Sequence, residues 1–205
     1  MSTLVLIRHG QSVWNAENRF TGWVDTPLSE LGRAEARQAG ERLAAEGARV
    51  DRAFTSTLVR AVDTGRIVLD QLGQTDLEQE RAWELNERFY GALTGRNKAQ
   101  TAEEFGAEQV HVWRRGFDVP PPGGESLADT TRRTLPYFER AVVPATREHD
   151  VVLVSAHGNS LRAIVKDLDQ LDDDAVTRLE IATGVPLVYE LADGRPTGKR
   201  ILAPL

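Results

Sequence analysis

Two short segments of the sequence, residues 3–7 and 151–154, consist almost entirely of valine, leucine and isoleucine. A strand that is apolar on both of its faces is typical of a parallel sheet that helices cover on both sides. Soon after each segment comes a histidine followed by a glycine, at His9 and at His157. The sequence therefore predicts two doubly buried strands whose carboxyl ends carry similar histidine turns.

Helices and further strands alternate along the rest of the chain, as apolar spacing and capping residues indicate. The predicted elements are a helix from Ser29 to about Gly47, a strand near 52–55, a helix over 58–72, a helix from Ser126 to about Val142 with a kink at Pro136, a helix over 159–168, and strands near 187–191 and 200–202. This alternation predicts an α/β fold, a three-layer sandwich with a mostly parallel central sheet.

The segment from about residue 79 to 124 does not follow this alternation. It is richer in loops and short helices, and it ends in Pro-Pro-Pro-Gly-Gly, which can continue neither a helix nor a central strand. Since 205 residues fit one compact domain better than two, we expect a single domain over 1–205 with a loop-rich insertion over one face of the sheet.

The composition excludes several kinds of chemistry. Without cysteine there can be no disulfide, no thiolate nucleophile and no cysteine-bound zinc. A net charge of -6 argues against a general nucleic-acid binder. No apolar stretch is long enough to span a bilayer, and the first residues lack the basic flank of a secretory signal. We expect a cytoplasmic protein that binds neither nucleic acid nor membranes.

The two histidine turns are predicted to meet. In open α/β sheets, ligands bind beyond the carboxyl ends of the strands, where the strand order reverses. His9 and His157 could face one another there, and Gly10 and Gly158 would let the backbone approach a ligand closely. The helix starts that follow would offer donors to an anion. This edge of the sheet therefore favours an anionic ligand.

An imidazole that attacks phosphorus must be neutral, with one ring nitrogen free. Arg8 should disfavour protonation of His9 and can bond phosphoryl oxygens. Arg60 could reach the same space from the helix over 58–72, or it could be an ordinary solvated arginine. His111 and His149 have no neighbouring motif, so we interpret them as ordinary histidines. His9 is the predicted nucleophile.

Residues 6–15, Leu-Ile-Arg-His-Gly-Gln-Ser-Val-Trp-Asn, resemble the signature of the histidine phosphatase superfamily. Further blocks resemble a narrower family within it, the cofactor-dependent phosphoglycerate mutases. These blocks are 20–23, 28–32, 55–61, 85–93, 97–98, 113–115, 118–122, 157–162, 183–184 and 186–190. The resemblance covers almost the whole chain.

The resemblance implies interconversion of 3-phosphoglycerate and 2-phosphoglycerate in glycolysis and gluconeogenesis. It implies 2,3-bisphosphoglycerate as the intermediate and as the primer of a phosphohistidine enzyme, and no metal. The implied partners are small phosphoglycerates, and a homo-oligomer stays open. The nearest alternative is a histidine phosphatase that acts on a small phosphorylated metabolite, with water as the acceptor. A silent phospholigand-binding protein and a metal hydrolase are more distant alternatives.

The resemblance also implies roles for single residues. His9 becomes the phosphorylated residue, protonated His157 stabilises the charge of the phosphoryl group, and Glu87 is an acid and base with a raised pKa. The other matching positions are Arg8, Ser12, Asn15 and Arg60 around the phosphoryl group, Tyr90, Lys98, Arg114 and Arg115 for the glycerate carboxylate and second phosphate, and Thr21, Gly22, Gly158 and Asn159 as further contacts. Without the resemblance, Glu87 and the two adjacent arginines would be interpreted as solvated charges.

The chain resembles a short form of the family. Only two glycines separate Pro122 from Glu125, where many relatives carry a longer segment, and the chain stops at Leu205 without the flexible tail of longer relatives. Such pieces help to exclude water from a phosphohistidine. We therefore expect a measurable side reaction in which bisphosphoglycerate is hydrolysed.

Overall fold

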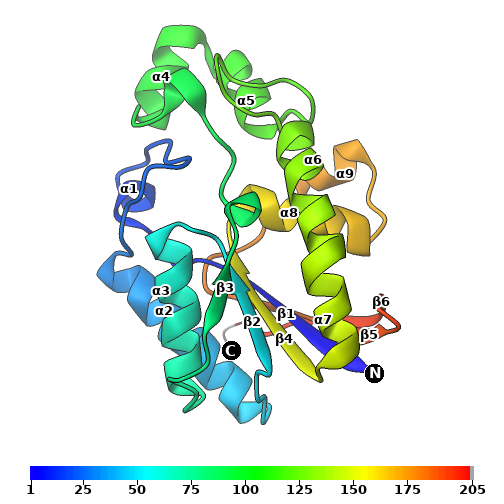
Figure 1. Cartoon of the computed structure of the whole chain (residues 1–205). Coiled ribbons are helices and arrows are strands. Elements are labelled where there is room, and N and C mark those ends of the chain that lie inside the picture. The colour runs from blue at the N-terminus through cyan, green and yellow to red at the C-terminus, as the bar shows by residue number, and fades with distance from the viewer. Residues whose placement is uncertain (204–205) are drawn as a thin grey trace.

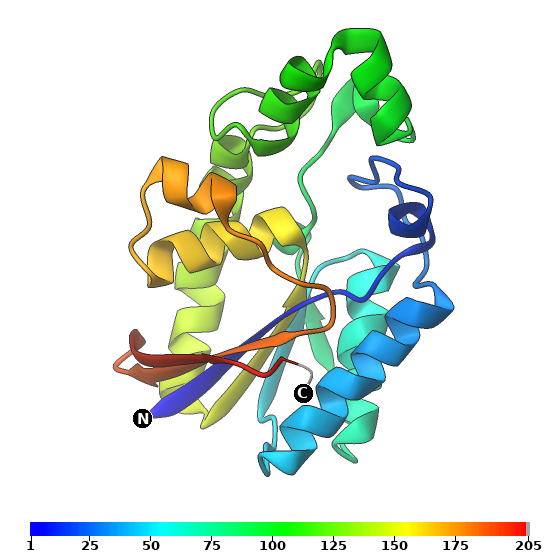
Figure 2. The ribbon, with the colours of Figure 1, turned by 180° about the vertical axis from the view of Figure 1, so that it is seen from behind.

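The computed structural model describes residues 1–203, in which six strands form one mixed sheet between two layers of helices (Figures 1 and 2). The strands are β1 Ser2–Arg8, β2 Arg52–Thr55, β3 Gln79–Arg81, β4 Val151–Ala156, β5 Pro186–Ala192 and β6 Arg195–Ile201. They lie in the order β3-β2-β4-β1-β5-β6. The first four of that order are parallel, and β5 and β6 are antiparallel to their neighbours. The predicted α/β fold is confirmed.

Side chains of β1 alternate between the two halves of the core. The flanking helices are α2 Glu30–Ala45 and α3 Val59–Gln71 on one face, and α6 Leu127–Tyr137, α7 Val143–Glu148 and α8 Gly158–Leu168 on the other (Figures 1 and 2). Val5 and Ile7 belong to the cluster beneath α2 and α3, whereas Leu4 and Leu6 belong to the cluster beneath α6, α7 and α8. All four are at most 1% exposed, which explains why the strand is apolar throughout.

The strand order creates a crevice between β1 and β4. These neighbours are parallel, but the long helix after β1, α2, covers one face of the sheet and the helix after β4, α8, covers the other. After β1 the chain therefore turns toward one face of the sheet, and after β4 it turns toward the other. A crevice lies between these two turns, at the carboxyl ends of the strands. The predicted meeting of the two histidine turns is located at this point.

The predicted helices are present, with one interruption. The helix from Ser29 has the expected cap, because the Ser29 hydroxyl accepts the Gly32 N–H at 3.1 Å. The helix from Ser126 runs to Tyr137 as α6, and a five-residue π-helical turn, Phe138–Val142, separates it from α7. Pro136 has no N–H to donate, so the regular hydrogen-bond ladder changes beside it.

The segment 79–124 begins with a strand and continues as a cap over one end of the sheet. Its first residues form β3, which pairs with β2, and the rest holds 3-10 turns at Trp83–Leu85 and Gly91–Leu93, followed by α4 Lys98–Phe105 and α5 Ala107–Arg115. Figure 1 shows α4 and α5 beyond one end of the sheet, so the expectation that they cover a face is wrong. A small core of Phe20, Leu93 and Val110 holds the cap to the segment after β1.

The last strand begins earlier than predicted. β6 starts at Arg195, because Asp193 and Gly194 both have positive φ, 52° and 79°, and make the tight turn of a hairpin with β5. The short helices α1 Val13–Ala16 and α9 Asp173–Arg178 complete the described elements. Among residues 1–203, no helix is long and apolar enough to cross a membrane.

Candidate active site

His9 and His157 lie together just past the ends of adjacent strands. Pairing of β1 with β4 places Arg8 opposite Ala156, so the residues that follow the two strands are neighbours. The two ring centroids are 4.9 Å apart, and the ring planes are inclined at 60°. Both side chains are buried. The two histidine turns of the sequence therefore form one site.

One ring nitrogen of His9 is available as a nucleophile. Its Nδ1 lies 2.7 Å from the carbonyl oxygen of Gly10, so Nδ1 carries the proton and Nε2 keeps its lone pair. Nε of Arg60 donates toward this Nε2 at 3.3 Å. Burial, then the charges of Arg60 and Arg8, hold the pKa of His9 well below its usual range. The imidazole is neutral, as attack on phosphorus requires.

His157 is held by Ser56. Its Nε2 lies 2.7 Å from the Ser56 hydroxyl, and its buried Nδ1 has no hydrogen-bond partner among residues 1–203. Burial, then the charges of Arg60 and His9, hold the pKa of His157 well below its usual range. The expectation of a protonated His157 is therefore wrong for this structure, since loss of water and nearby cations disfavour the charged ring. A neutral ring with its proton on Nδ1 still donates one hydrogen bond.

Arg60 and Arg8 bring positive charge to His9. Arg60, in the first turn of α3, is 1% exposed, and its Nη2 donates to the carbonyl oxygen of Gly22 at 2.8 Å. Burial lowers its pKa to about 10, so it stays charged at neutral pH. Arg8 donates from Nη1 to the carbonyl oxygen of Ile181 at 2.8 Å. Arg60 is therefore not a solvated helix arginine, and backbone carbonyls leave both charges available to an anion.

Glu87 is a buried carboxylate that accepts three hydrogen bonds through Oε1. The donors are the Arg88 N–H at 2.8 Å, the Asn159 N–H at 3.2 Å and the Asn159 Nδ2 at 2.7 Å. Burial raises the pKa of Glu87, but these bonds and the charges of Arg8 and Arg60 bring it below its usual value. The expected raised pKa is wrong, because the acid lies among cations and donors. Glu87 is therefore ready to accept a proton.

A narrow cavity of about 60 Å³ connects most of these side chains. Nine predicted site residues line it, with Arg19 and Phe20 besides: Arg8, His9, Asn15, Thr21, Gly22, Arg60, Glu87, Tyr90 and Lys98. Burial lowers the pKa of Lys98. Tyr90 raises this pKa, whereas the charges of Arg114 and then Arg8 lower it further. The charge of Arg114 therefore also acts on this cavity.

Three other predicted residues lie next to residues of the cavity without lining it. Ser12 is buried and caps α1, its hydroxyl accepting the Asn15 N–H at 3.1 Å. Gly158 and Asn159 begin α8, and Asn159 reaches Glu87 as described. Ser12 thus orders the turn that carries Asn15, and the start of α8 orders the carboxylate.

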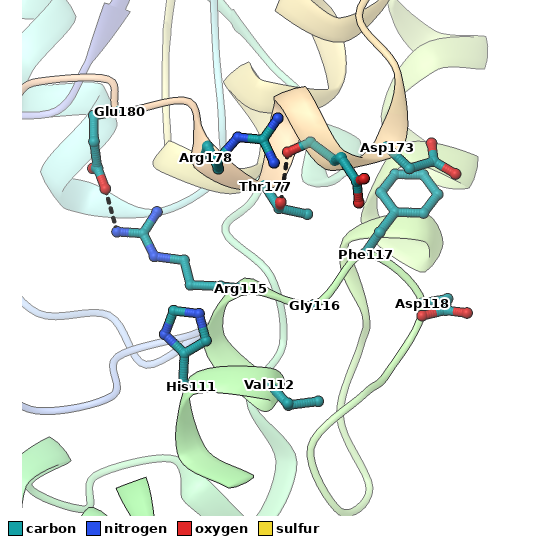
Figure 3. Close-up of a pocket in the computed structure, with 11 residues that line it drawn as sticks. His111, Val112, Arg115, Gly116, Phe117, Asp118, Asp173, Thr177, Arg178 and Glu180 are labelled. Atoms are coloured by element: carbon teal, nitrogen blue, oxygen red, sulfur yellow. Dashed lines mark hydrogen bonds and ion pairs between the residues drawn. The ribbon is translucent and has the colours of Figure 1, made fainter. Parts of the chain in front are cut away.

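Arg115 points away from this cavity. It lines a separate hollow of about 660 Å³ between α5 and α9, together with His111 and Arg178 (Figure 3). There its Nη2 forms an ion pair with Glu180 (Figure 3). Arg114 and Arg115 diverge because successive residues of a helix are rotated by about 100°. The structure does not bring the two adjacent arginines together.

The two glycines that follow the histidines have different surroundings. A Cβ on Gly10 would lie 2.2 Å from the carbonyl oxygen of Gly32 in α2, so backbone packing requires this glycine. A Cβ on Gly158 would lie 3.5 Å from Nε of Arg8 and 3.7 Å from Oε2 of Glu87, which is ordinary contact. The close approach predicted for Gly10 is therefore to a helix rather than to a ligand.

Two residues beside the site were missed by the sequence analysis. Arg88 is 0% exposed and donates from Nη2 to the carbonyl oxygen of Arg114 at 2.6 Å, while its Nε and Nη1 have no partner in the described chain. Ser56 holds His157. Both lie inside recognised blocks, but a loop arginine and a short serine carry no periodic signal that marks burial.

Buried polar atoms without partners belong to two residues that line the cavity and to the adjacent His157, and they fit phosphoryl oxygens. Arg8 Nε, Thr21 Oγ1 and His157 Nδ1 are buried and find no hydrogen-bond partner within residues 1–203. Buried donors of this kind normally have partners, so they indicate a ligand with several acceptors. In the same part of the chain, no group of three or more His, Cys, Asp or Glu side chains is placed to hold a metal ion. A neutral imidazole, two arginines and a carboxylate at the end of an α/β sheet define a phosphoryl-transfer enzyme.

Comparisons with known proteins agree with this class. The model of the histidine phosphatase superfamily (branch 1) matches residues 4–203, and the chain belongs to this superfamily. A relative from Parvibaculum lavamentivorans, named 2,3-bisphosphoglycerate-dependent phosphoglycerate mutase, is 55% identical over 190 residues, which cover 93% of this chain and 90% of the relative. A relative of the same name from a Caulobacter species is 50% identical over 225 aligned positions, which cover 98% of this chain and 95% of the relative.

Solved structures of the superfamily have the same fold. A mycobacterial glucosyl-3-phosphoglycerate phosphatase superposes with a TM-score of 0.81 at 28% identity over 93% of each chain. YhfR from Bacillus stearothermophilus superposes with a TM-score of 0.82 at 27% identity, covering 96% of this chain and 94% of its own. Both likenesses extend over nearly the whole chain.

Proposed function

We propose that this chain interconverts 3-phosphoglycerate and 2-phosphoglycerate by carrying a phosphoryl group on His9. The activity follows from the relatives named phosphoglycerate mutase, at about half identity over nearly their full length. The observation that carries the proposed mechanism is the unprotonated Nε2 of a neutral His9, toward which Arg60 donates at 3.3 Å, close to Arg8 and to buried polar atoms without partners in the described residues. When bound, 2,3-bisphosphoglycerate supplies the phosphoryl group that first loads His9.

Glu87 moves the proton. When a glycerate hydroxyl attacks phosphorus on His9, an oxygen–phosphorus bond forms, the nitrogen–phosphorus bond breaks, and the Glu87 carboxylate takes the hydroxyl proton. In the opposite transfer, the Nε2 lone pair attacks phosphorus and Glu87 returns the proton to the oxygen that leaves. His9 and Glu87 end in their starting states, so the proton balance closes over one cycle.

The cations of the site neutralise the group in transfer. Arg8 and Arg60 face the phosphoryl oxygens, and the His157 Nδ1–H donates to one of them. This positive charge is the reason that the proposed transfer needs no metal ion. Tyr90, Lys98 and Arg114 lie on the cap side and hold the glycerate carboxylate or its second phosphate. Arg115 takes part only if it leaves Glu180.

The two histidines lie far apart in the sequence but in one site, which supports a further proposal that residues 1–205 act as one domain. The superfamily match from 4 to 203 includes both. The substrates belong to glycolysis and gluconeogenesis, so we place the activity in the cytoplasm. The proposed steps use residues of this chain alone, so they need no partner protein or nucleic acid. They are also compatible with a homo-oligomer.

Labelled 2,3-bisphosphoglycerate tests the mechanism. We expect label on His9, and isomerisation that depends on this primer. His9→Gln should abolish both, whereas His111→Gln, outside the cavity, should keep both. Label absent from His9, or isomerisation indifferent to the primer, would refute the proposal. Release of inorganic phosphate without isomerisation would instead establish the phosphatase alternative, which the 28% identical phosphatase structure makes worth measuring.

A further inference from the structure

Arg162 is a buried arginine of α8 that the mechanism above does not use. It is 8% exposed, and its Nε donates to the carbonyl oxygen of Leu179 at 2.8 Å. Its Nη1 donates to Oδ1 of Asn159 at 3.2 Å, and its Nη2 lies 3.7 Å from Oε2 of Glu180. Burial lowers its pKa to about 10, so it remains a cation. Its contact with Asn159 links it to the site.

Asn159 joins Arg162 to Glu87 through the two ends of one amide. Its Oδ1 accepts from Arg162, and its Nδ2 donates to Oε1 of Glu87 at 2.7 Å. An arginine side chain has donors only, so it requires the oxygen end of the amide to face it. If the amide turned over, its oxygen would face the carboxylate oxygen, and two acceptors would oppose each other. The contact with Arg162 therefore selects one of the two amide orientations.

We propose that Arg162 is a positioning residue that fixes the amide of Asn159 and thereby keeps Glu87 in the form that accepts a proton. This inference rests on the proposed role of Glu87 in proton transfer. Burial has the largest effect on the pKa of Glu87 and raises it. The Arg88 N–H and then the side-chain amide of Asn159 have the next largest effects, and both lower this pKa. Without Arg162 only the Glu87 carboxylate opposes a turned amide, so the amide is held less firmly and this stabilisation of the carboxylate weakens.

Several groups besides Arg162 act on Glu87. Glu87 interacts through its charge with five side chains. These are Arg8 from β1, Arg60 from α3, Tyr90, Lys98 from α4 and Arg162 from α8. Arg133 of α6 reaches only the backbone carbonyl of Glu87, at 3.0 Å. Since Arg162 is itself a cation near Glu87, the test must separate its charge from its hydrogen bond.

The test compares Arg162→Met with Arg162→Lys, which keeps the charge but cannot reproduce the guanidinium contacts. Lys166→Met is the matched control. Lys166 lies one turn further along α8, and it also donates to a backbone carbonyl, that of Leu171 at 2.9 Å. It forms an ion pair with Asp173 and has no contact with Asn159 among these bonds. Thermal unfolding of each variant establishes that it folds.

We expect the acidic limb of the pH profile of isomerisation, measured as kcat/KM, to move to higher pH by about one unit in both Arg162 variants. The substrate ionises identically with every variant, so the displacement belongs to the enzyme. The limb should stay in place in Lys166→Met. If Arg162→Met does not fold, Arg162→Lys carries the test alone, because it keeps the charge. If Arg162→Lys does not fold, Arg162→Met is compared with Arg162→Gln, which loses the charge but can still donate to Oδ1 of Asn159, and an equal displacement in these two would overturn the inference.

Equal loss of activity at all pH values would show a merely structural role and overturn the inference. A displacement in Arg162→Met alone would overturn it too, because charge rather than amide orientation would then be the cause. Labelling of His9 with 2,3-bisphosphoglycerate in the parent and in the variants distinguishes failure of the inference about Arg162 from failure of the proposed function. If the label reaches His9 but the limb does not move, the inference about Arg162 fails alone.

Discussion

The rings of His9 and His157 lie 4.9 Å apart, and both imidazoles are buried beside Arg60. Folding thus brings two bases to a place where their protonated forms are disfavoured. Because their folded pKa values are lowered, the unfolded chain binds more protons than the folded chain below about pH 6.5. Stability should be complete above that pH and fall as the pH decreases, by about 1.4 kcal/mol per pH unit for each histidine.

Urea unfolding at several pH values between 7.5 and 5 measures this slope. His157→Gln removes one of the two titrating groups and should reduce the slope by about half. His149→Gln, at the end of α7, is the control and should leave it unchanged. A free energy of unfolding that stays constant over this range would contradict the neutral state of both rings.

Glu87→Gln should lower isomerisation by about 10²–10⁴-fold, and it should also lower stability at neutral pH, because the neutral amide loses the attraction of Arg8 and Arg60. The glutamine oxygen can still accept the N–H groups of Arg88 and Asn159, but it cannot take a proton. Steady-state rates and thermal unfolding measure the two effects. Glu84→Gln, whose carboxylate pairs with Arg140, is the control and should retain activity within about twofold. Equal losses in both variants would remove Glu87 from its proposed role.

Gly10→Ala and Gly158→Ala should have opposite signatures. A Cβ on Gly10 meets the backbone of Gly32 at 2.2 Å, so we expect destabilisation by about 3 kcal/mol. A Cβ on Gly158 fits, but it contacts Arg8 and Glu87, so stability should persist while activity falls. Denaturant unfolding and initial rates on both variants check the pair. A stable Gly10→Ala protein would show that the contact between α2 and the turn after β1 can adjust to a Cβ.

Arg133→Met should destabilise the protein by about 3 kcal/mol. Its side chain is 9% exposed, and the guanidinium pairs with Glu125 at 2.8 Å and donates to the carbonyl oxygens of Glu84 and Glu87. Removal leaves a half-buried carboxylate and several unpaired carbonyls. Arg132→Met, on the same helix with a 74% exposed side chain, should cost at most about 1 kcal/mol. Similar unfolding free energies for both variants would refute this account.

The central features of the fold and site could be predicted because they depend on local signals. Two strands apolar on both faces indicate a covered parallel sheet, and their His-Gly ends indicate the carboxyl edge, which is where the structure has His9 and His157. Helix caps such as Ser29 are read from a few neighbouring residues. The Asp193-Gly194 turn carried an equally local hairpin signal, and using it would have placed the start of β6 correctly.

The charge state of the site could not be read from the sequence. Burial raises the pKa of Glu87, but the N–H of the adjacent Arg88 and then Asn159, Arg8 and Arg60, which come from three other elements, bring it below its usual value. The direction of Arg115 depends on Glu180, far along the chain. Such effects require the positions of distant side chains, and a motif records residue types without these distances. Ser56 and Arg88 were missed for the same reason.

The position of β1 in the sheet also matters while the chain is being made. β1 is the first strand to leave a ribosome, yet its two neighbours are β4 and β5, from the last third of the chain. Until those segments emerge, a strand apolar on both faces has no partner on either edge, a state prone to aggregation. Nascent chains stopped near residue 150 should therefore bind chaperones or precipitate, and centrifugation of such chains beside full-length ones would reveal it.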